Sequence, residues 1–253
     1  MGQACRLRQI GSGARIVGSV KTLDRLREAP ARAAILLDID GTLAPIVERP
    51  EDARVPETTR EVLRALVARY GLVGAVTGRE GSVGRGLVGV EGITVVGNHG
   101  LELDEGAEPW RARLQEFSRS VDWPVEDKGL SLSFHYRTAE DPERARAELE
   151  QVAERARRQG LNARFGRMIL EVVPPIDANK GPAVRELLAR AGLRRALFAG
   201  DDTTDLDAFA AIEELEVGVK VAVESAEGPQ ALRERADIVV AGTDGLVDLL
   251  RQL

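Results

Sequence analysis

The segment Asp38-Ile39-Asp40-Gly41-Thr42-Leu43 carries the strongest chemical signal in the sequence. It directly follows residues 33–37, an apolar run typical of a strand that is buried on both faces of a parallel sheet. Side chains two residues apart in an extended segment point the same way, so Asp38 and Asp40 are expected to project together beyond this strand. Such close carboxylates repel each other unless a cation or a proton relieves them. The segment therefore predicts either a cation-binding pair of carboxylates or an Asp- and Gly-rich turn that closes the strand.

Three distant segments favour the first interpretation. Residues 76–79 offer the hydroxyl of Thr77 and backbone N–H groups after a second expected strand, where they could hold a phosphate. Lys180 stands at an expected helix start, where a cation is unusual unless an anion is nearby. Residues 200–205 bring three further acids to the end of another strand. Each segment alone has an ordinary explanation as a capped turn, a solvated lysine or an acidic helix start, but together they predict a phosphate site.

The elements that must position these groups alternate between strand and helix. Strands are expected at residues 33–37, 72–76, 93–96, 196–199, 217–223 and 237–241, and helices at residues 56–70, 182–191, 205–215 and 245–253. This alternation predicts an α/β fold with a Rossmann-like parallel sheet and helices on both of its faces. Ligands bind such sheets at the carboxyl ends of the strands, where the segments above are expected.

The middle of the chain breaks the alternation. Residues 130–136 alternate apolar and polar side chains as in a half-solvated antiparallel strand, residues 141–159 form a charged helix, and residues 164–173 a hairpin about Gly166. We therefore expect a smaller α+β cap, residues 104–175, inserted into a core made of residues 31–103 and 176–253. Residues 1–30 are expected to form a loose N-terminal tail, with Gly11, Ser12 and Gly13 in support.

Composition excludes several classes of function. The 253 residues carry a formal charge of −6, which argues against binding a nucleic-acid backbone. One cysteine, Cys5, and two histidines, His99 and His135, leave carboxylates as the expected metal ligands, which favours Mg²⁺. The sequence has neither a signal peptide nor an apolar run long enough to span a membrane, so we expect no membrane association and a cytoplasmic protein.

At the level of motifs, the chain resembles the haloacid dehalogenase-like phosphatase superfamily, through residues 38–43, Thr77, Lys180 and residues 200–205. More narrowly, it is similar to the trehalose-6-phosphate phosphatase family. The narrower resemblance covers roughly residues 30 to 250 and is carried by residues 40–46, 77–79, 98–102, 126–128, 135–137 and 200–205. Thr77 stands where the family usually has serine, so the hydroxyl is retained.

The resemblance implies a role for each catalytic residue. Asp38 would be the nucleophile that forms an aspartyl phosphate. Asp40 would protonate the departing sugar oxygen and then act as base for the hydrolytic water. Asp38, the backbone carbonyl of Asp40 and Asp201 would hold Mg²⁺, with Asp202 and Asp205 nearby. Thr77 and Lys180 would hold the phosphate oxygens.

The resemblance also implies that the cap is a lid, which closes over the crevice and excludes water. The lid residues that would face the distal sugar are Glu126, Lys128, Arg137 and Glu171, and the substrate-binding residues of the core would be Gly78 and Arg79. His99 and Asn98 sit at a strand end, and for His99 we favour a role in fixing a loop over one in catalysis. Trp110 and Trp123 are interpreted as core residues rather than as a stacking platform for sugar.

Three alternatives stay open. The same chemistry could serve another sugar phosphate, such as sucrose 6-phosphate or mannosyl-3-phosphoglycerate. The chain could instead be a non-catalytic, Mg²⁺-dependent phosphosugar-binding module, although such a module has no need of an acid at Asp40. It could also be the phosphatase half of a bifunctional system, in which case a trehalose-phosphate synthase would be a separate partner.

Overall fold

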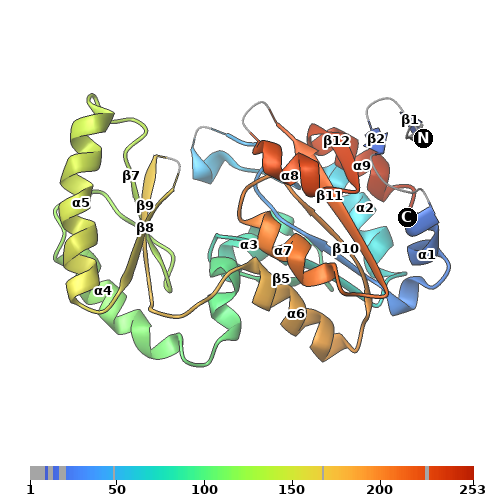
Figure 1. Cartoon of the computed structure of the whole chain (residues 1–253), viewed down its shortest axis with the longest axis horizontal. Helices are drawn as coiled ribbons and strands as arrows, with labels where there is room; N and C mark the ends of the chain where they lie inside the picture. The colour runs from blue at the N-terminus through green and yellow to red at the C-terminus, as the bar shows by residue number, and fades with distance from the viewer. Residues whose placement is uncertain (1–8, 11–13, 17–20, 48, 167, 226–227) are drawn as a thin grey trace, which may run out of the picture.

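The computed structural model describes residues 9–10, 14–16, 21–47, 49–166, 168–225 and 228–253. Gly11, Ser12 and Gly13, which supported the expected loose tail, lie outside the described residues. Figure 1 shows two parts of unequal size, a larger part built on one sheet and a smaller part with its own sheet.

Among the described residues, the larger sheet has eight strands in the order β1-β2-β12-β11-β10-β3-β4-β5. The strands are β1 (Gln9–Ile10), β2 (Ala14–Ile16), β3 (Ala34–Leu37), β4 (Leu72–Val76), β5 (Thr94–Val96), β10 (Arg195–Gly200), β11 (Val217–Glu224) and β12 (Ile238–Ala241). All pairs from β12 to β5 are parallel, whereas β2 runs antiparallel to β12 and β1 antiparallel to β2. The parallel part places the carboxyl ends of β3, β4 and β10 side by side.

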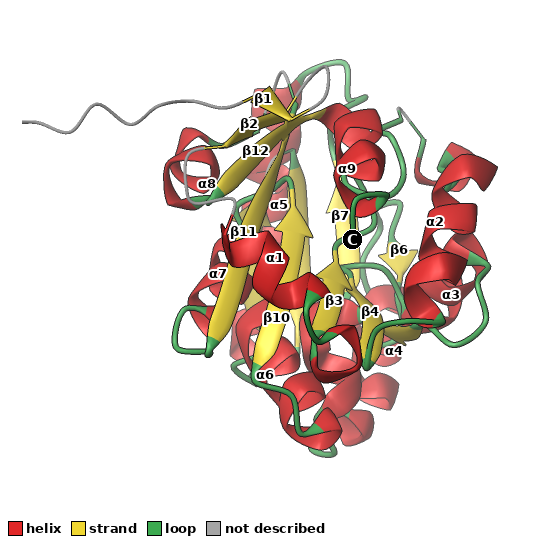
Figure 2. Cartoon of the chain, turned by 90° about the vertical axis from the view of Figure 1, so that its right-hand side faces the viewer, coloured by secondary structure: helices red, strands yellow, loops and turns green. Residues whose placement is uncertain are grey.

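Helices cover both faces of this sheet, because each central strand is apolar on both sides. In β3, Ile35 and Leu37 belong to the hydrophobic cluster on one face and Ala34 and Leu36 to the cluster on the other. The first cluster includes residues of α1 (Lys21–Arg27), α2 (Glu57–Val67), α3 (Gly81–Val88) and α9 (Gly242–Leu250). The second includes residues of α6 (Lys180–Ala191), α7 (Asp205–Ile212) and α8 (Gln230–Arg235). Figure 2 shows the sheet between these two sets of helices.

The smaller part, here called the lid, lies between β5 and α6 in the chain. Its described strands pair antiparallel in the order β6-β7-β9-β8. They are β6 (Glu126–Asp127), β7 (Leu132–His135), β8 (Asn162–Gly166) and β9 (Ile169–Val173). One face of this sheet packs its apolar side chains against α4 (Arg111–Arg119) and α5 (Pro142–Arg158) in a third hydrophobic cluster. The lid therefore has a core of its own on one face of its sheet.

The expected α/β fold class with an inserted smaller α+β part is confirmed, and most differences concern the ends of elements. The helix α6 begins at Lys180, two residues before the expected start, because Asn179 caps it by accepting a hydrogen bond from the N–H of Gly181 (2.9 Å). The helices α1, α3, α4 and α8 were not expected. The exact limits of core and cap stay a prediction.

The N-terminal segment differs from the expected loose tail at β1 and β2, which extend the large sheet beyond β12, and also over residues 21–27. These residues form α1, and its side chains Leu23 and Leu26 are fully buried in the core. Two leucines three residues apart are a weak signal in a seven-residue helix, which explains why the sequence pattern did not reveal it. No helix in the described part of the chain is long and apolar enough to cross a membrane.

Candidate active site

A crevice of about 410 Å³ lies between the carboxyl ends of the central strands and the lid. Ten of the eleven residues expected at the site line it, namely Asp38, Asp40, Thr77, Gly78, Arg79, Glu126, Lys128, Arg137, Lys180 and Asp201. The eleventh, Glu171, lines a neighbouring chamber. Residues that are far apart in the sequence thus meet in one crevice. Those of the core do so because β3, β4 and β10 are neighbours whose carboxyl ends lie side by side.

Lys180 connects two buried carboxylates. Its Nζ donates to Oδ1 of Asp38 (2.6 Å) and to Oδ1 of Asp205 (2.7 Å), and its side chain is 2% exposed. Burial alone would lower the pKa of Lys180, but Asp205 and Asp38 outweigh burial and raise it. The ammonium therefore stays charged in the buried floor of the crevice, where a negatively charged phosphate can approach it.

Asp205 has a structural task in addition. Its Oδ2 accepts hydrogen bonds from the backbone N–H groups of Asp201 and Asp202, both at 2.9 Å. These bonds fold the turn between β10 and α7, so they hold Asp201 at the end of its strand. Asp205 thus fixes both the ammonium of Lys180 and the backbone that carries Asp201.

Asp38, Asp201 and Asp205 form a buried group whose oxygens could hold a metal ion, with the potential ligand atoms within 4.8 Å of one another. Burial, with the added effect of Asp205 and Asp201, outweighs the opposing effect of Lys180 and raises the pKa of Asp38 well above its ordinary value. Burial and Asp205 raise the pKa of Asp201 to about 7. Three buried carboxylates face one ammonium in this group, so a further cation would relieve their repulsion.

The chemistry of this group fits Mg²⁺, because every side-chain donor is a carboxylate oxygen. Gly41, with a φ of +79°, leaves the space that Asp201 needs, since a Cβ at this position would lie 2.1 Å from Oδ2 of Asp201. Thr42 donates from Oγ1 to Oδ1 of the same carboxylate at 3.4 Å. The glycine that follows Asp40 therefore allows Asp201 to approach the loop after β3.

Thr77 and Gly78 form the turn after β4, and His99 packs against it. The backbone N–H of His99 donates to the backbone oxygen of Thr77 (2.9 Å). A Cβ on Gly78 would lie 2.5 Å from Nε2 of the His99 imidazole. Burial and the nearby Lys180 lower the pKa of His99 to about 3, so the imidazole is neutral. These contacts favour a role for His99 in shaping the turn.

Asp40 and Arg79 form an ion pair on the core side of the crevice. Nε of Arg79 donates to Oδ2 of Asp40 and its Nη2 to Oδ1, both at 2.7 Å. Nη1 of the same arginine donates to the backbone oxygen of Pro50 (3.1 Å). This pair could not be predicted from the sequence, because the two residues follow different strands.

On the lid side, Glu126 lies close to His135 and Lys128. His135 Nε2 lies 2.9 Å from Oε2 of Glu126, and Nζ of Lys128 lies 3.5 Å from the same oxygen. The hydrogen bond with His135 is the main cause of the lowered pKa of Glu126. A charged carboxylate and a cation thus stand together on the lid, where they can accept from and donate to hydroxyl groups.

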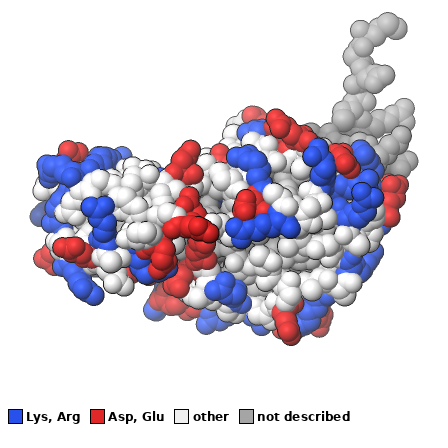
Figure 3. Space-filling model, turned by 90° about the horizontal axis from the view of Figure 1, so that it is seen from below, with Lys and Arg blue, Asp and Glu red and all other residues white. Residues whose placement is uncertain are grey.

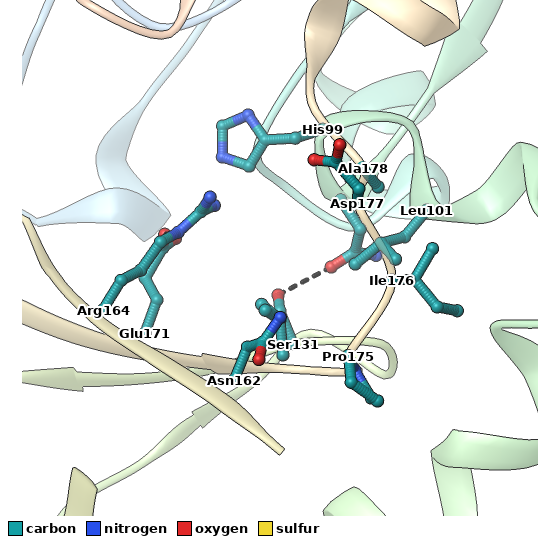
Figure 4. A pocket seen from close by; sticks show the side chains of 12 residues that line it. His99, Leu101, Ser131, Asn162, Arg164, Glu171, Pro175, Ile176, Asp177 and Ala178 are labelled. Atoms are coloured by element: carbon teal, nitrogen blue, oxygen red, sulfur yellow. Dashed lines mark hydrogen bonds and ion pairs between the residues drawn. The ribbon is translucent and has the colours of Figure 1, made fainter. Parts of the chain in front are cut away.

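Glu171 faces a chamber of about 370 Å³ next to the crevice, and His99 lines both cavities. In Figure 4, the side chains of Arg164 and Glu171 reach from the lid sheet toward His99. Burial alone would raise the pKa of Glu171, but the pKa is lowered, and the cations Arg164 and Lys128 are among the causes that oppose burial. Arg164 was not anticipated, since only the pairing of β8 with β9 brings it beside Glu171.

The tryptophans of the lid and the charged surface lie outside the crevice. Trp110 and Trp123 pack against the hydrophobic cluster of the lid, as interpreted from the sequence. Seen from below, acidic side chains gather where the lid meets the larger part, and basic side chains are dispersed over both parts (Figure 3).

Residues 36–123 and 114–237 match the family model described as Trehalose-phosphatase. The chain belongs to the trehalose-phosphatase family. Among its relatives, a protein of Sinorhizobium fredii named "Probable trehalose-phosphate phosphatase" is 34% identical over 202 residues, which are 72% of this chain and 74% of that protein.

Two further comparisons concern a longer relative and a solved structure. A Mycobacterium tuberculosis protein named "Uncharacterized glycosyl hydrolase" is 33% identical over 219 residues, and the match spans 75% of this chain but 16% of that protein. The crystal structure of a trehalose-6-phosphate phosphatase related protein superposes with a TM-score of 0.70 at 26% identity, covering 87% of this chain and 96% of that one. The chain thus corresponds to one segment of the much longer mycobacterial protein.

Proposed function

We propose that this chain hydrolyses trehalose 6-phosphate to trehalose and inorganic phosphate through an aspartyl phosphate on Asp38. The observation that carries the proposal is the shared crevice: Asp38 and Lys180 line its floor, while Glu126 and Lys128 line it from the lid. A phosphate at the floor and a sugar under the lid can therefore belong to one substrate. Membership in the trehalose-phosphatase family supports this choice of substrate.

In the first step, a carboxylate oxygen of Asp38 attacks phosphorus, and the bond between phosphorus and the sugar oxygen breaks. Asp40 gives a proton to the departing oxygen. In the second step, water attacks the phosphorus of the aspartyl phosphate while Asp40 takes a proton from it, which releases phosphate and restores Asp38. The side chain of Asp40 is 41% exposed toward the crevice, so it can reach both the leaving group and water.

The phosphate is held from several sides in this proposal. Lys180 and the hydroxyl of Thr77 bind its oxygens, and Gly78 lines the crevice beside Thr77. Mg²⁺ would be held by Asp38, the backbone carbonyl of Asp40 and Asp201, and it would neutralise charge on the transferring phosphoryl group. Asp205 contributes by fixing Lys180 and the backbone of Asp201, because both of its oxygens already accept hydrogen bonds.

The sugar is bound mainly by the lid. Glu126, Lys128 and Arg137 supply acceptors and donors above the crevice, and Glu171 supplies a further acceptor where the neighbouring chamber meets it. Arg79 reaches the substrate from the core side next to Asp40. A cytoplasmic location and a separate trehalose-phosphate synthase as partner are part of the same proposal.

A panel of sugar phosphates tests the proposal. Purified protein with Mg²⁺ is offered trehalose 6-phosphate, sucrose 6-phosphate, mannosyl-3-phosphoglycerate and glucose 6-phosphate, and released phosphate is measured over many turnovers. We expect trehalose 6-phosphate to give the highest kcat/KM. Release of no more than one phosphate per protein molecule indicates a binding module instead of an enzyme. A higher kcat/KM for another substrate reassigns the specificity.

A further inference from the structure

The polar face of the lid sheet carries an unbroken row of paired side chains. In the register of the sheet, Glu126 of β6 is opposite Ser133 of β7, Ser133 is opposite Glu171 of β9, and Glu171 is opposite Arg164 of β8. Directly opposed residues of neighbouring strands point to the same face of a sheet. The four side chains therefore form one line across the lid, on the face opposite to α4 and α5.

This row has a direction relative to the crevice. Glu126 at one end lines the crevice, whereas Glu171 and Arg164 line the neighbouring chamber. Arg164 belongs to β8, the edge strand farthest from β6 in the lid sheet. Along the row, Arg164 is therefore farther from Glu126 and the crevice than Glu171 is.

The contact between the last two members of the row is a direct ion pair. Nε of Arg164 donates to Oε2 of Glu171 at 3.0 Å. The side chain of Glu171 is 17% exposed and that of Arg164 is 48% exposed. Because the carboxylate of Glu171 is largely buried, it needs a hydrogen-bonded cation to stay charged and to keep its orientation. The bond uses Oε2, so the second oxygen of the carboxylate, Oε1, can be directed at a ligand.

We propose that Arg164 is a positioning residue for sugar recognition, which acts by holding the carboxylate of Glu171 in the orientation that accepts a hydroxyl group of the second sugar. This inference rests on the proposed function, because it requires a substrate with a second sugar under the lid. Figure 4 shows the two side chains lying next to each other and reaching toward His99, where the chamber adjoins the crevice. Arg164 has no part in the phosphate chemistry, since Asp38 and Lys180 line the crevice and not the chamber.

The test is a double-mutant cycle with Arg164→Met, Glu171→Gln and the double variant, in which kcat/KM is measured for trehalose 6-phosphate and glucose 6-phosphate. Arg164→Met should lower kcat/KM for trehalose 6-phosphate by about tenfold and leave glucose 6-phosphate within about twofold. In the Glu171→Gln background, Arg164→Met should have no further effect, because residues that act as a unit are not additive. Arg164→Lys should recover most of the loss, since a lysine can also donate to Oε2.

A matched control separates this role from a structural one. Arg157 donates to the backbone oxygen of Ala163, the neighbour of Arg164 in β8, and lines neither cavity. Arg157→Met should leave both substrates unchanged. Equal losses for both substrates in Arg164→Met would indicate a general structural role and overturn the inference.

Two further outcomes are decisive. A loss from Arg164→Met that persists in full in the Glu171→Gln background would mean that Arg164 contacts the sugar itself, and it would also overturn the inference. Either result leaves the proposed function intact if the wild type still prefers trehalose 6-phosphate. Without such a preference in the wild type, both the substrate assignment and the role of Arg164 are wrong.

Discussion

Arg79 occupies both carboxylate oxygens of Asp40 through two hydrogen bonds, each 2.7 Å long. The arginine side chain is 14% exposed and is anchored by a third bond to the backbone oxygen of Pro50. The guanidinium group is a rigid fork, so this arrangement fixes the plane of the carboxylate. In the proposed reaction Asp40 must transfer a proton twice, and its orientation therefore depends on Arg79.

Replacing Arg79 by Met should impair proton transfer more than phosphoryl transfer. General acids and bases are worth about 10²–10⁴-fold, so a misoriented Asp40 should lower kcat for sugar phosphates by about 10–100-fold. A substrate with a good leaving group, such as p-nitrophenyl phosphate, needs less protonation and should lose much less in the first step. Single-turnover rates with both substrates measure the difference, and equal losses would argue against a role through Asp40. The exposed Arg85 of α3 provides a control.

Asp38→Asn and Asp40→Asn should fail at different steps. The amide of Asp38→Asn cannot attack phosphorus, so neither turnover nor phosphoenzyme is expected. Asp40→Asn retains the nucleophile but lacks the base for hydrolysis, so with a good leaving group it should accumulate phosphate on Asp38. Mass spectrometry of the quenched protein measures this. Activity of Asp38→Asn within about tenfold of the wild type would be incompatible with an aspartyl phosphate.

Without a metal ion, the protein should lose stability as pH rises toward neutrality. The pKa of Asp201 is raised to about 7 by burial and by Asp205, so this carboxyl holds its proton more tightly when folded than when unfolded. Its contribution to the free energy of unfolding is complete below about pH 4 and is lost as pH rises to 7. The loss is on the order of 1–4 kcal/mol, at about 1.4 kcal/mol for each unit of pKa difference.

Urea unfolding at pH 5 and pH 8, with EDTA or with Mg²⁺, checks this expectation. Mg²⁺ should restore stability at pH 8, and Asp201→Asn should reduce both the pH dependence in EDTA and the response to Mg²⁺. Asp207→Asn is a suitable control, because Asp207 is exposed in the first turn of α7. A wild-type protein that is equally stable at both pH values in EDTA would contradict this expectation. It would show that ionisation of Asp201 does not destabilise the metal-free fold.

Local patterns were sufficient to predict the floor of the crevice. Asp38, Thr77 and Asp201 each follow a short apolar run that is typical of a buried strand, and parallel strands bring their carboxyl ends together. Lys180 could be placed because a helix start after Asn179 fixes it near the same edge. In these cases the residue type, the preceding strand and the topology rule point to one location.

Contacts set by strand register or by side-chain choice could not be predicted. The pairing of Arg164 with Glu171 depends on the register of β8 and β9. That register is set by the length of the turn between the two strands, which the sequence does not specify. The ion pair between Asp40 and Arg79 could not be predicted because several carboxylates line the same crevice, and the sequence does not show which of them the arginine contacts. The helix α1 was missed because its stability comes from packing against the sheet and not from its own pattern.

The ratio of kcat/KM for trehalose 6-phosphate to that for glucose 6-phosphate tests the central claim most directly. Both substrates present the same primary phosphate ester to Asp38, so they differ only in the second sugar that the lid is proposed to bind. Two lost hydrogen bonds to charged partners, at roughly 1.5–3 kcal/mol each, predict a ratio on the order of 10²–10⁴. Part of the loss should appear in kcat, because binding of the second sugar contributes to closing the lid. A ratio near one would contradict the account and leave a sugar phosphatase that does not recognise the second sugar.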